Sequence, residues 1–468
     1  MPRCHVCALC VILAVVTDAI PHYWRGEEFP RQQLQEKEKK DDEGIFFTQR
    51  LDHFDRNLPT TFEQRYFLND TMFVEMSASG SGVAPPVFLC VGGEGPPMDS
   101  SVLVASDHCN DMVELAPQYG ALMLALEHRY YGPSTPNGDY STGNLKYLNT
   151  EQALGDISTF HEYITDMYNL SSANRWVTWG GSYPGMLSAL ARLRYPHLIH
   201  AAVSSSSPLN AQVEMEEYNE VVASSISAEI VGGSNACLSA VTSGHKAIGD
   251  LLTTSDGRRS LEEMFNLCVP HSLEDEGNRE QFAGDGVIYI PAQSNDPSCN
   301  TPYCDIASIC DFMTNTDDSL SPIEKLAQLS KAQHLGSCVT VSYKAMLKTM
   351  ALPNNPIRSW LYQTCTEWGF YQTCPVGSTC PYTQGLHTLQ VDYEICEMAF
   401  DISSEQVNNQ VANTRSIYGA ENIQGSRIIY PNGQIDPWSA LGVLNTPAGS
   451  TEQPTLWVEG ARYFFPFL

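Results

Sequence analysis

Basic residues are scarce in this sequence. Its 26 lysines and arginines stand against 54 aspartates and glutamates, and the formal net charge is −28 at pH 7. A surface with this balance repels polyphosphates and anionic lipids, and no dense Lys/Arg patch offsets the repulsion. Nucleic acid and an anionic membrane surface are therefore excluded as expected partners.

Long hydrophobic runs are also missing. No apolar run reaches the roughly 18 residues that a membrane-spanning helix needs. At the N-terminus, Arg3 precedes a shorter apolar run over residues 6–16, and small residues follow near Ala19. This is the pattern of a secretory signal peptide. We expect cleavage near residue 20, so that residues 1–20 are a signal peptide and the mature chain is soluble, without a membrane span.

Cysteine spacing of the zinc-binding kind is absent. Beyond Cys10 there is no Cys-x-x-Cys pair and no His-x-x-x-His pair, so we expect no metal site. Of the 15 cysteines, twelve lie at or after Cys90, an even number that suits disulfides in an oxidising compartment. Such a route leads to the extracellular space or to endosomes and lysosomes. There, the sequons at Asn69 and Asn169 predict N-glycosylation.

The rest of the chain divides into segments of different character. Residues 21–44 form a charged leader without periodicity, which is typical of disorder; a pro-segment is the alternative. In residues 45–208, short apolar runs alternate with helical patterns, which predicts an α/β sheet with mostly parallel strands. Residues 209–385 hold amphipathic helical stretches and many cysteines, which predicts an inserted helical, disulfide-tied subdomain. The strand pattern resumes in residues 386–468.

The stretch NRWVTWGGSYPGML, residues 174–187, contains a candidate nucleophile. It reads as a strand, a glycine pair, Ser182 and the start of a helix. It resembles the Gly-x-Ser-x-Gly turn that exposes a catalytic serine, with the last glycine displaced by one position. The alternative is a glycine-rich turn that happens to contain serine. The flanking strand and helix favour the nucleophile.

A serine nucleophile also needs an orienting acid and donors for the oxyanion. Asp436 follows a late strand in YPNGQIDPW, where hydrolases of this layout place the acid; an Asp-Pro turn is the alternative. The expected oxyanion donors are the backbone N–H groups of Tyr183 and of the loop Gly93, Glu94 and Gly95. A phosphate-binding loop is disfavoured, because no Lys-Ser/Thr follows.

Several motifs together resemble one family. They are LCVGGEGP, LEHRYYGPS, LNTEQALGDI, WGGSYPGMLSALARLRYPHLIHAAVSSSSPL, CTEWGFYQTC and NGQIDPWSALGV. Over residues 44–460 the chain resembles the proline-directed serine exopeptidases, which include lysosomal Pro-Xaa carboxypeptidase, dipeptidyl peptidase II and thymus-specific serine protease. The resemblance implies an α/β-hydrolase fold with a helical, disulfide-containing cap, a peptide substrate and no cofactor. It also implies that Met186 and Trp438 line a pocket for proline; ordinary core packing is their alternative.

One part of the implied site is missing. The family places its catalytic histidine after the final strand, where this chain reads GARYFF with Arg462, and the last of the 12 histidines is His387. Arginine does not accept a proton at working pH, and we expect no rescue by His128, which precedes the serine. The 468-residue form is therefore expected to be inactive or C-terminally truncated. The alternative is a non-catalytic secreted protein of this fold that binds peptides or a protein partner. Carboxypeptidase against dipeptidyl peptidase specificity and a homodimer stay open.

Overall fold

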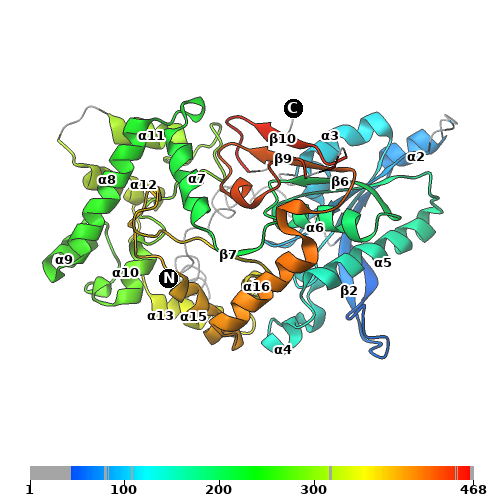
Figure 1. Cartoon of the computed structure of the whole chain (residues 1–468), viewed down its shortest axis with the longest axis horizontal. Coiled ribbons are helices and arrows are strands. Elements are labelled where there is room, and N and C mark those ends of the chain that lie inside the picture. Colours follow the sequence, from blue (N-terminus) through cyan, green and yellow to red (C-terminus); the bar gives the residue numbers. More distant parts are fainter. Residues whose placement is uncertain are drawn as a thin grey trace, which may run out of the picture. The chain divides into compact units, whose positions relative to one another are not determined.

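The computed structural model describes residues 44–78, 82, 84–106, 109–315, 319–447, 449–450 and 452–463. The predicted signal peptide, and the leader up to residue 43, lie outside them. The described chain forms two compact units. One, the helical unit, holds Glu214–Leu352 and Tyr371–Asp401, and the other, the sheet unit, holds the rest (Figure 1). The predicted boundaries 45–208, 209–385 and 386–468 stay a prediction.

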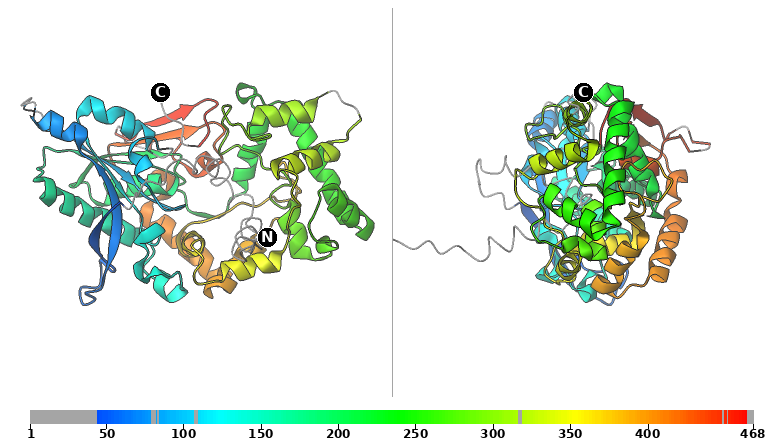
Figure 2. Two further views of the ribbon diagram at one scale, coloured as in Figure 1. Left: turned by 180° about the vertical axis from the view of Figure 1, so that it is seen from behind. Right: turned by 90° about the vertical axis from the view of Figure 1, so that its left-hand side faces the viewer.

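Eight strands of the sheet unit form one sheet, in the order β1-β2-β4-β3-β5-β6-β9-β10. They are β1 (Ile45–Arg50), β2 (Thr61–Asn69), β3 (Val87–Val91), β4 (Leu122–Leu126), β5 (Trp176–Gly181), β6 (Ile199–Ser205), β9 (Ile428–Gly433) and β10 (Thr455–Val458). β2 runs antiparallel to β1 and β4, and all other pairs are parallel. Figure 2 shows β9 and β10 side by side at one end of the sheet.

This strand order is that of an α/β-hydrolase, and the predicted fold class is confirmed. Every residue of β3 and β4 is buried, as expected for strands covered on both faces. A short two-stranded sheet pairs β7 (Gln212–Glu214) with β8 (Gly369–Tyr371). Among the described residues, no helix has both the length and the apolar character needed to cross a bilayer.

The helices of the sheet unit hold its strands in place. They are α2 (Thr71–Ala78), α3 (Asn110–Tyr119), α4 (Thr142–Leu145), α5 (Thr150–Tyr168), α6 (Ser182–Arg194), α14 (Arg358–Gln363), the π-helical η7 (Thr364–Trp368) and α16 (Ser404–Tyr418). Met112 of α3 and Phe88 of β3 belong to one buried apolar cluster. The disulfide Cys90–Cys109 joins β3 to the residue before α3, and α6 packs on β5 and β6.

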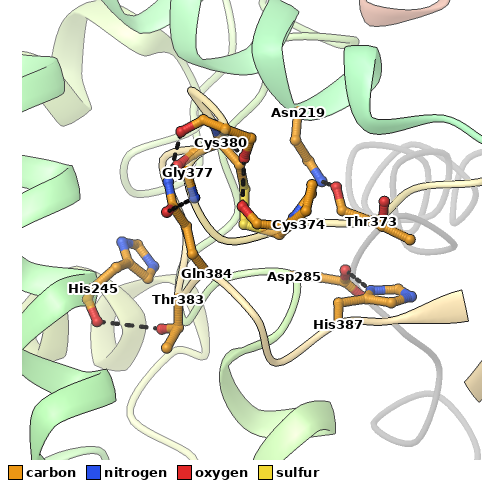
Figure 3. The surroundings of a disulfide bond; sticks show 12 residues. Asn219, His245, Asp285, Thr373, Cys374, Gly377, Cys380, Thr383, Gln384 and His387 are labelled. Carbon is orange, nitrogen blue, oxygen red and sulfur yellow. Dashed lines mark hydrogen bonds and ion pairs between the residues drawn. A yellow bond between two sulfur atoms is a disulfide. The ribbon is translucent and has the colours of Figure 1, made fainter. Parts of the chain in front are cut away.

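The helical unit is built around α8 (Asn235–Leu252), which packs against five other helices. The unit contains α7 (Glu216–Ser227), α9 (Ser255–Met264), α10 (Glu276–Ala283), α11 (Ile306–Thr314), α12 (Pro322–Gln333), α13 (Tyr343–Met350) and α15 (Leu389–Phe400). Its disulfides include Cys237–Cys310 between α8 and α11, and Cys374–Cys380 (Figure 3). All twelve cysteines from Cys90 onward are disulfide-bonded, which confirms that expectation.

Candidate active site

Ser182 lies at the junction of a strand and a helix. β5 ends at Gly181 and α6 begins at Ser182. The backbone of Ser182 has a φ of 60°, which is uncommon for a residue with a side chain and typical of a strained functional turn. The strand and the helix are therefore present where the nucleophile pattern requires them.

Glycines leave the space that this turn needs. A Cβ on Gly180 would lie 2.4 Å from the Pro184 carbonyl oxygen. One on Gly185 would lie 2.1 Å from Ser207 Oγ, and one on Gly93 would lie 2.3 Å from Pro184 Cγ. Gly185 thus has a steric reason to be glycine, although it is displaced by one position from the usual pattern. The close approach of Gly93 also brings the loop after β3 against the first turn of α6.

The site also contains the side chain of Glu94, for which the sequence pattern predicts only a backbone N–H donor. The half-buried carboxylate of Glu94 accepts a hydrogen bond at Oε1 from Ser182 Oγ, at 2.8 Å. The signal available in the sequence was an acidic residue between two glycines, directly after a buried parallel strand. Gly95 next to it has a φ of 115°, a conformation that favours glycine.

Asp436 is fully buried three residues after the end of β9. Its Oδ1 accepts a hydrogen bond from the Trp438 N–H at 2.9 Å, whereas its Oδ2 has no hydrogen-bond partner among the described residues. Burial raises the pKa of Asp436 to about 7, against the opposing effects of the Trp438 N–H and the Ser206 hydroxyl. The site thus holds a carboxyl group with one oxygen left for a donor.

The segment after β6 connects the nucleophile turn with the acid. β5, β6 and β9 are neighbouring parallel strands, so their carboxyl ends lie at the same edge of the sheet. Ser206 follows β6, is buried, has a φ of 48° and hydrogen-bonds the Asp436 side chain. Its neighbour Ser207 is the residue that Gly185 approaches. The structure therefore brings Ser182 and Asp436 to one edge of the sheet. The segment with Ser206 and Ser207 contacts both α6 and Asp436 there.

His128 follows β4, and both of its ring nitrogens are engaged. Nδ1 lies 2.7 Å from the Arg129 carbonyl oxygen, so Nδ1–H donates there. Nε2 is then the acceptor for the Tyr183 hydroxyl, at 3.1 Å. Burial lowers the pKa of His128 to about 4. This geometry leaves no ring nitrogen for the Ser182 hydroxyl.

The segment after β10 returns to the end of β9. The Ile435 N–H donates to the Ala461 carbonyl oxygen at 3.1 Å, and a Cβ on Gly433 would lie 2.7 Å from the Arg462 carbonyl oxygen. Arg462, the position where the family resemblance implies a histidine, is thus held at the loop that leads to Asp436.

Among the other predicted residues, Trp438 contacts this hydrogen-bonded group through its backbone N–H, which donates to Asp436. Met186 is completely buried in α6, and the half-buried Trp438 makes an edge contact with Phe370, with 5.5 Å between ring centroids. Asn69 is half-buried and Asn169 is exposed. Their roles in substrate binding and glycosylation stay predictions. In the part of the chain that the structure describes, no group of three or more His, Cys, Asp or Glu side chains could hold a metal ion.

Known proteins are similar in sequence to this chain over most of its length. The family described as "Serine carboxypeptidase S28" matches residues 49–464. Thymus-specific serine protease of Mus musculus is 34% identical over 444 residues, 89% of this chain and 81% of that protein. Lysosomal Pro-X carboxypeptidase of Bos taurus is 27% identical over 422 residues, 85% of this chain and 78% of that protein. A solved structure, the proline iminopeptidase of Mycobacterium smegmatis, aligns with 12% identity and a TM-score of 0.36, over 90% of this chain and 92% of that chain.

Proposed function

The chain belongs to the serine carboxypeptidase S28 family, and from that premise we propose the roles of its site residues. Membership makes it a serine-type peptidase. In the proposed site Ser182 is the nucleophile, Asp436 is the acid of the triad, and the N–H groups of Tyr183 and of the Gly93–Gly95 loop stabilise the oxyanion. The observation that carries this proposal is the φ of 60° at Ser182 between β5 and α6, because it is the strained turn that exposes a catalytic hydroxyl.

The proposed reaction is the removal of terminal residues from peptides next to proline or a small apolar residue. The name of the bovine relative, Lysosomal Pro-X carboxypeptidase, supports this substrate class. The twelve disulfide-bonded cysteines support a route through the secretory pathway, and we propose an extracellular or lysosomal location for the mature chain. Met186 and Trp438 are the proposed contacts for the proline ring.

The proposed turnover of the 468-residue form is low. Arg462 stands where the family resemblance implies the catalytic histidine, and loss of a triad member costs on the order of 10⁴–10⁶ in turnover in a well-studied serine protease. Oxyanion stabilisation and substrate binding retain roughly 10³–10⁴ over water. A second candidate function, peptide binding without hydrolysis, is favoured by one observation: Asp436 Oδ2 is without a hydrogen-bond partner among the described residues.

A fluorophosphonate probe tests the assignment on the mature chain. We expect slow labelling that maps to Ser182 by peptide mass spectrometry and that disappears in Ser182→Ala. Arg462→His should increase the labelling rate, because it restores an imidazole at the position that the family resemblance implies. Labelling that persists in Ser182→Ala, or that maps to another serine, would remove the basis of the assignment.

A further inference from the structure

Basic side chains gather at the edge of the sheet opposite to the proposed active site. β5, β6 and β9 are neighbouring parallel strands, so their amino ends meet at one edge, as their carboxyl ends do at the other. Arg175 directly precedes β5, His200 is the second residue of β6, and Arg427 directly precedes β9. Arg192 of α6 joins them, because its charge acts on His200. The sequence contains no dense basic patch, but the fold brings these four residues together as the basic edge cluster.

His200 lies between the two flanking strands. The partners of β5 on β6 shift from Ile199 to Ala201, so His200 is the extra residue of a β-bulge, a feature that re-aims side chains. On the other side, the Ala202 N–H donates to the Arg427 carbonyl oxygen at 3.0 Å. Arg427 Nη1 in turn donates to His200 Nδ1 at 3.2 Å. The packing of β6 against β9 thus joins side chains that are 227 positions apart in the chain.

The bond to Arg427 fixes the proton of the His200 ring. A guanidinium only donates, so Nδ1 is the acceptor, and the ring proton of the neutral imidazole is then on Nε2. In the part of the chain that the structure describes, the bond to Arg427 is the hydrogen bond that the His200 side chain makes. Nε2–H is therefore available to donate to an acceptor from outside the chain.

Arg192 brings a buried positive charge to the cluster. Its Nε and Nη2 donate to the carbonyl and hydroxyl oxygens of Ser426, and its Nη1 donates to the carbonyl oxygens of Pro196 and Ile199, at 2.7 to 2.8 Å. All of these acceptors are neutral. Glu452 is the carboxylate whose charge acts on Arg192, but among the described residues the two form no ion pair. The charge of Arg192 is therefore not neutralised by a direct contact.

Arg175 and Arg427 extend the cluster to the surface. Both are exposed, and within the described ranges neither forms an ion pair, although the sequence holds 54 acidic side chains against 26 basic ones. Arg427 also has a φ of 57°, which is uncommon for a residue with a long side chain and is typical of functional sites. Burial, followed by the charges of Arg427, Arg175 and Arg192, lowers the pKa of His200. The cluster thus concentrates positive charge on a strongly acidic protein.

We propose that the basic edge cluster binds a tetrahedral oxyanion, sulfate or phosphate, held by the guanidinium groups of Arg175 and Arg427 and by His200 Nε2–H. Guanidinium groups donate paired hydrogen bonds to such an anion, and Arg192 adds a buried charge to the same cluster. The anion also offsets the repulsion among cations that lack a paired carboxylate in the described chain.

The net charge of −28 favours a single anionic group over a long polyanion. Charges are screened over about 8 Å at physiological ionic strength, so an oxyanion that fits within the cluster is attracted by its arginines, whereas a longer polyanion also meets the acidic surface of the protein. The group can be a free ion or the end of a sulfate or phosphate monoester, because both present the same oxygens. The site is independent of the proposed peptidase reaction.

Isothermal titration calorimetry of the purified mature chain with sodium sulfate tests the proposal, at an ionic strength kept constant with sodium chloride. We expect one sulfate ion to bind per chain. Arg427→Gln and Arg175→Gln should each weaken binding by about ten-fold or more, because each removes a charge-assisted hydrogen bond. The matched control is Arg56→Gln, an exposed arginine between β1 and β2, which should bind sulfate as the unchanged chain does.

Sulfate binding should also tighten as the pH falls from 7.5 to 5.5. Imidazole ordinarily protonates near pH 6.5. The charges of Arg175, Arg192 and Arg427 oppose the protonation of His200, and a bound dianion favours it. Sulfate keeps both of its charges over this range, so the pH dependence reports on the protein. His200→Gln retains an amide donor that does not titrate, and its sulfate affinity should be equal at the two pH values.

The outcomes decide both the site and the source of the anion. If methyl phosphate binds as tightly as inorganic phosphate, the ligand is a monoester; if only the inorganic ion binds, the ligand is the free ion, and either result supports the site. The proposal is wrong if the unchanged chain binds no sulfate, if Arg175→Gln and Arg427→Gln bind it equally well, or if heparin binds more tightly than sulfate. Circular dichroism ensures that lost binding is not lost folding; should Arg427→Gln not fold, Arg175→Gln decides alone.

Discussion

Gly185 lies directly against Ser207, so that a Cβ on this glycine would be 2.1 Å from Ser207 Oγ. The contact joins the first turn of α6, which starts at Ser182, to the segment after β6. Because the neighbouring Ser206 hydrogen-bonds Asp436, the same segment reaches the buried acid. The distance between α6 and this segment is therefore set by a residue without a side chain.

Gly185→Ala is expected to disturb the nucleophile turn. The added methyl group must displace Ser207 or the start of α6, and overpacking of this kind costs about 1–3 kcal/mol. We predict a lower Tm and a fall of Ser182 labelling to a small fraction of its original rate. The control is Gly143→Ala in α4, where an added Cβ meets nothing within 4 Å. Equal Tm and labelling in the two variants would contradict the prediction.

Asp436→Asn should change the pH dependence of stability. The folded carboxyl titrates at about 7 and the unfolded one near its ordinary value of 3.8. The folded state therefore binds the extra proton, and the chain loses stability as pH rises from about 4 to 7. Asparagine has no such charge, and its oxygen can still accept from Trp438. We predict that the Tm of the variant, relative to the unchanged chain, rises by several degrees from pH 4.5 to pH 7.5.

The control for this variant is Asp166→Asn, an exposed residue of α5. It should show no comparable change in relative Tm between the two pH values. A parallel pH dependence of Asp436→Asn and the unchanged chain would show that the buried carboxyl does not carry the effect.

Asp156→Asn should strongly destabilise the sheet unit. Arg129 is fully buried and donates from Nε and Nη2 to Asp156, at 2.7 and 2.6 Å. Removing the carboxylate leaves a buried, unpaired guanidinium, which costs about 3–5 kcal/mol. Lys246→Ala breaks the exposed pair with Asp250 and should cost only about 0.3–0.5 kcal/mol. Denaturant unfolding measures both; losses of similar size would contradict the assigned difference in burial.

The helical unit should be more stable in acid than at neutral pH. His387 points toward Asp285 (Figure 3) and bonds it through Nδ1, while its Nε2 lies 3.4 Å from Asp392 Oδ2. Against the effect of burial, these carboxylates raise the pKa of His387. Its stabilising contribution is complete below about pH 6.5 and is lost as pH rises through the folded pKa. Burial also raises the pKa of Asp392, and that of Glu280 to about 7.

All three shifts have the same sign, since the folded unit holds protons that the unfolded chain releases. We predict that Tm falls by several degrees between pH 5 and pH 8, as about 1 kcal/mol moves the Tm of such a domain by roughly 2–4 °C. Glu280→Gln should flatten the decline between about pH 4.5 and 7. Glu276→Gln, an almost fully exposed residue on the same helix, should leave it unchanged. A Tm that rises with pH would reverse the assigned sign.

The features that the sequence predicts are those that depend on residues close together in the chain. β3, β4 and β5 stand out as short apolar runs because strands covered on both faces need such side chains, and the Ser182 turn has its own glycine pattern. The bond from Ser182 to Glu94 joins residues 88 positions apart, and only the packing of two loops determines it. α16 was not among the expected elements, although the capping box of Ser403 and Gln406 marks its start.

The disulfide Cys90–Cys109 closes a covalent ring of the chain, with a sequence separation of 19 between its ends, and the loop with Glu94 lies inside this ring. Closing a ring of this size removes about 3 kcal/mol of conformational freedom from the unfolded chain. The carboxylate that accepts the Ser182 hydrogen bond is thus held on both sides by this disulfide. Reduction of the Cys90–Cys109 disulfide would therefore loosen the loop that carries Glu94 without changing any residue of the proposed site.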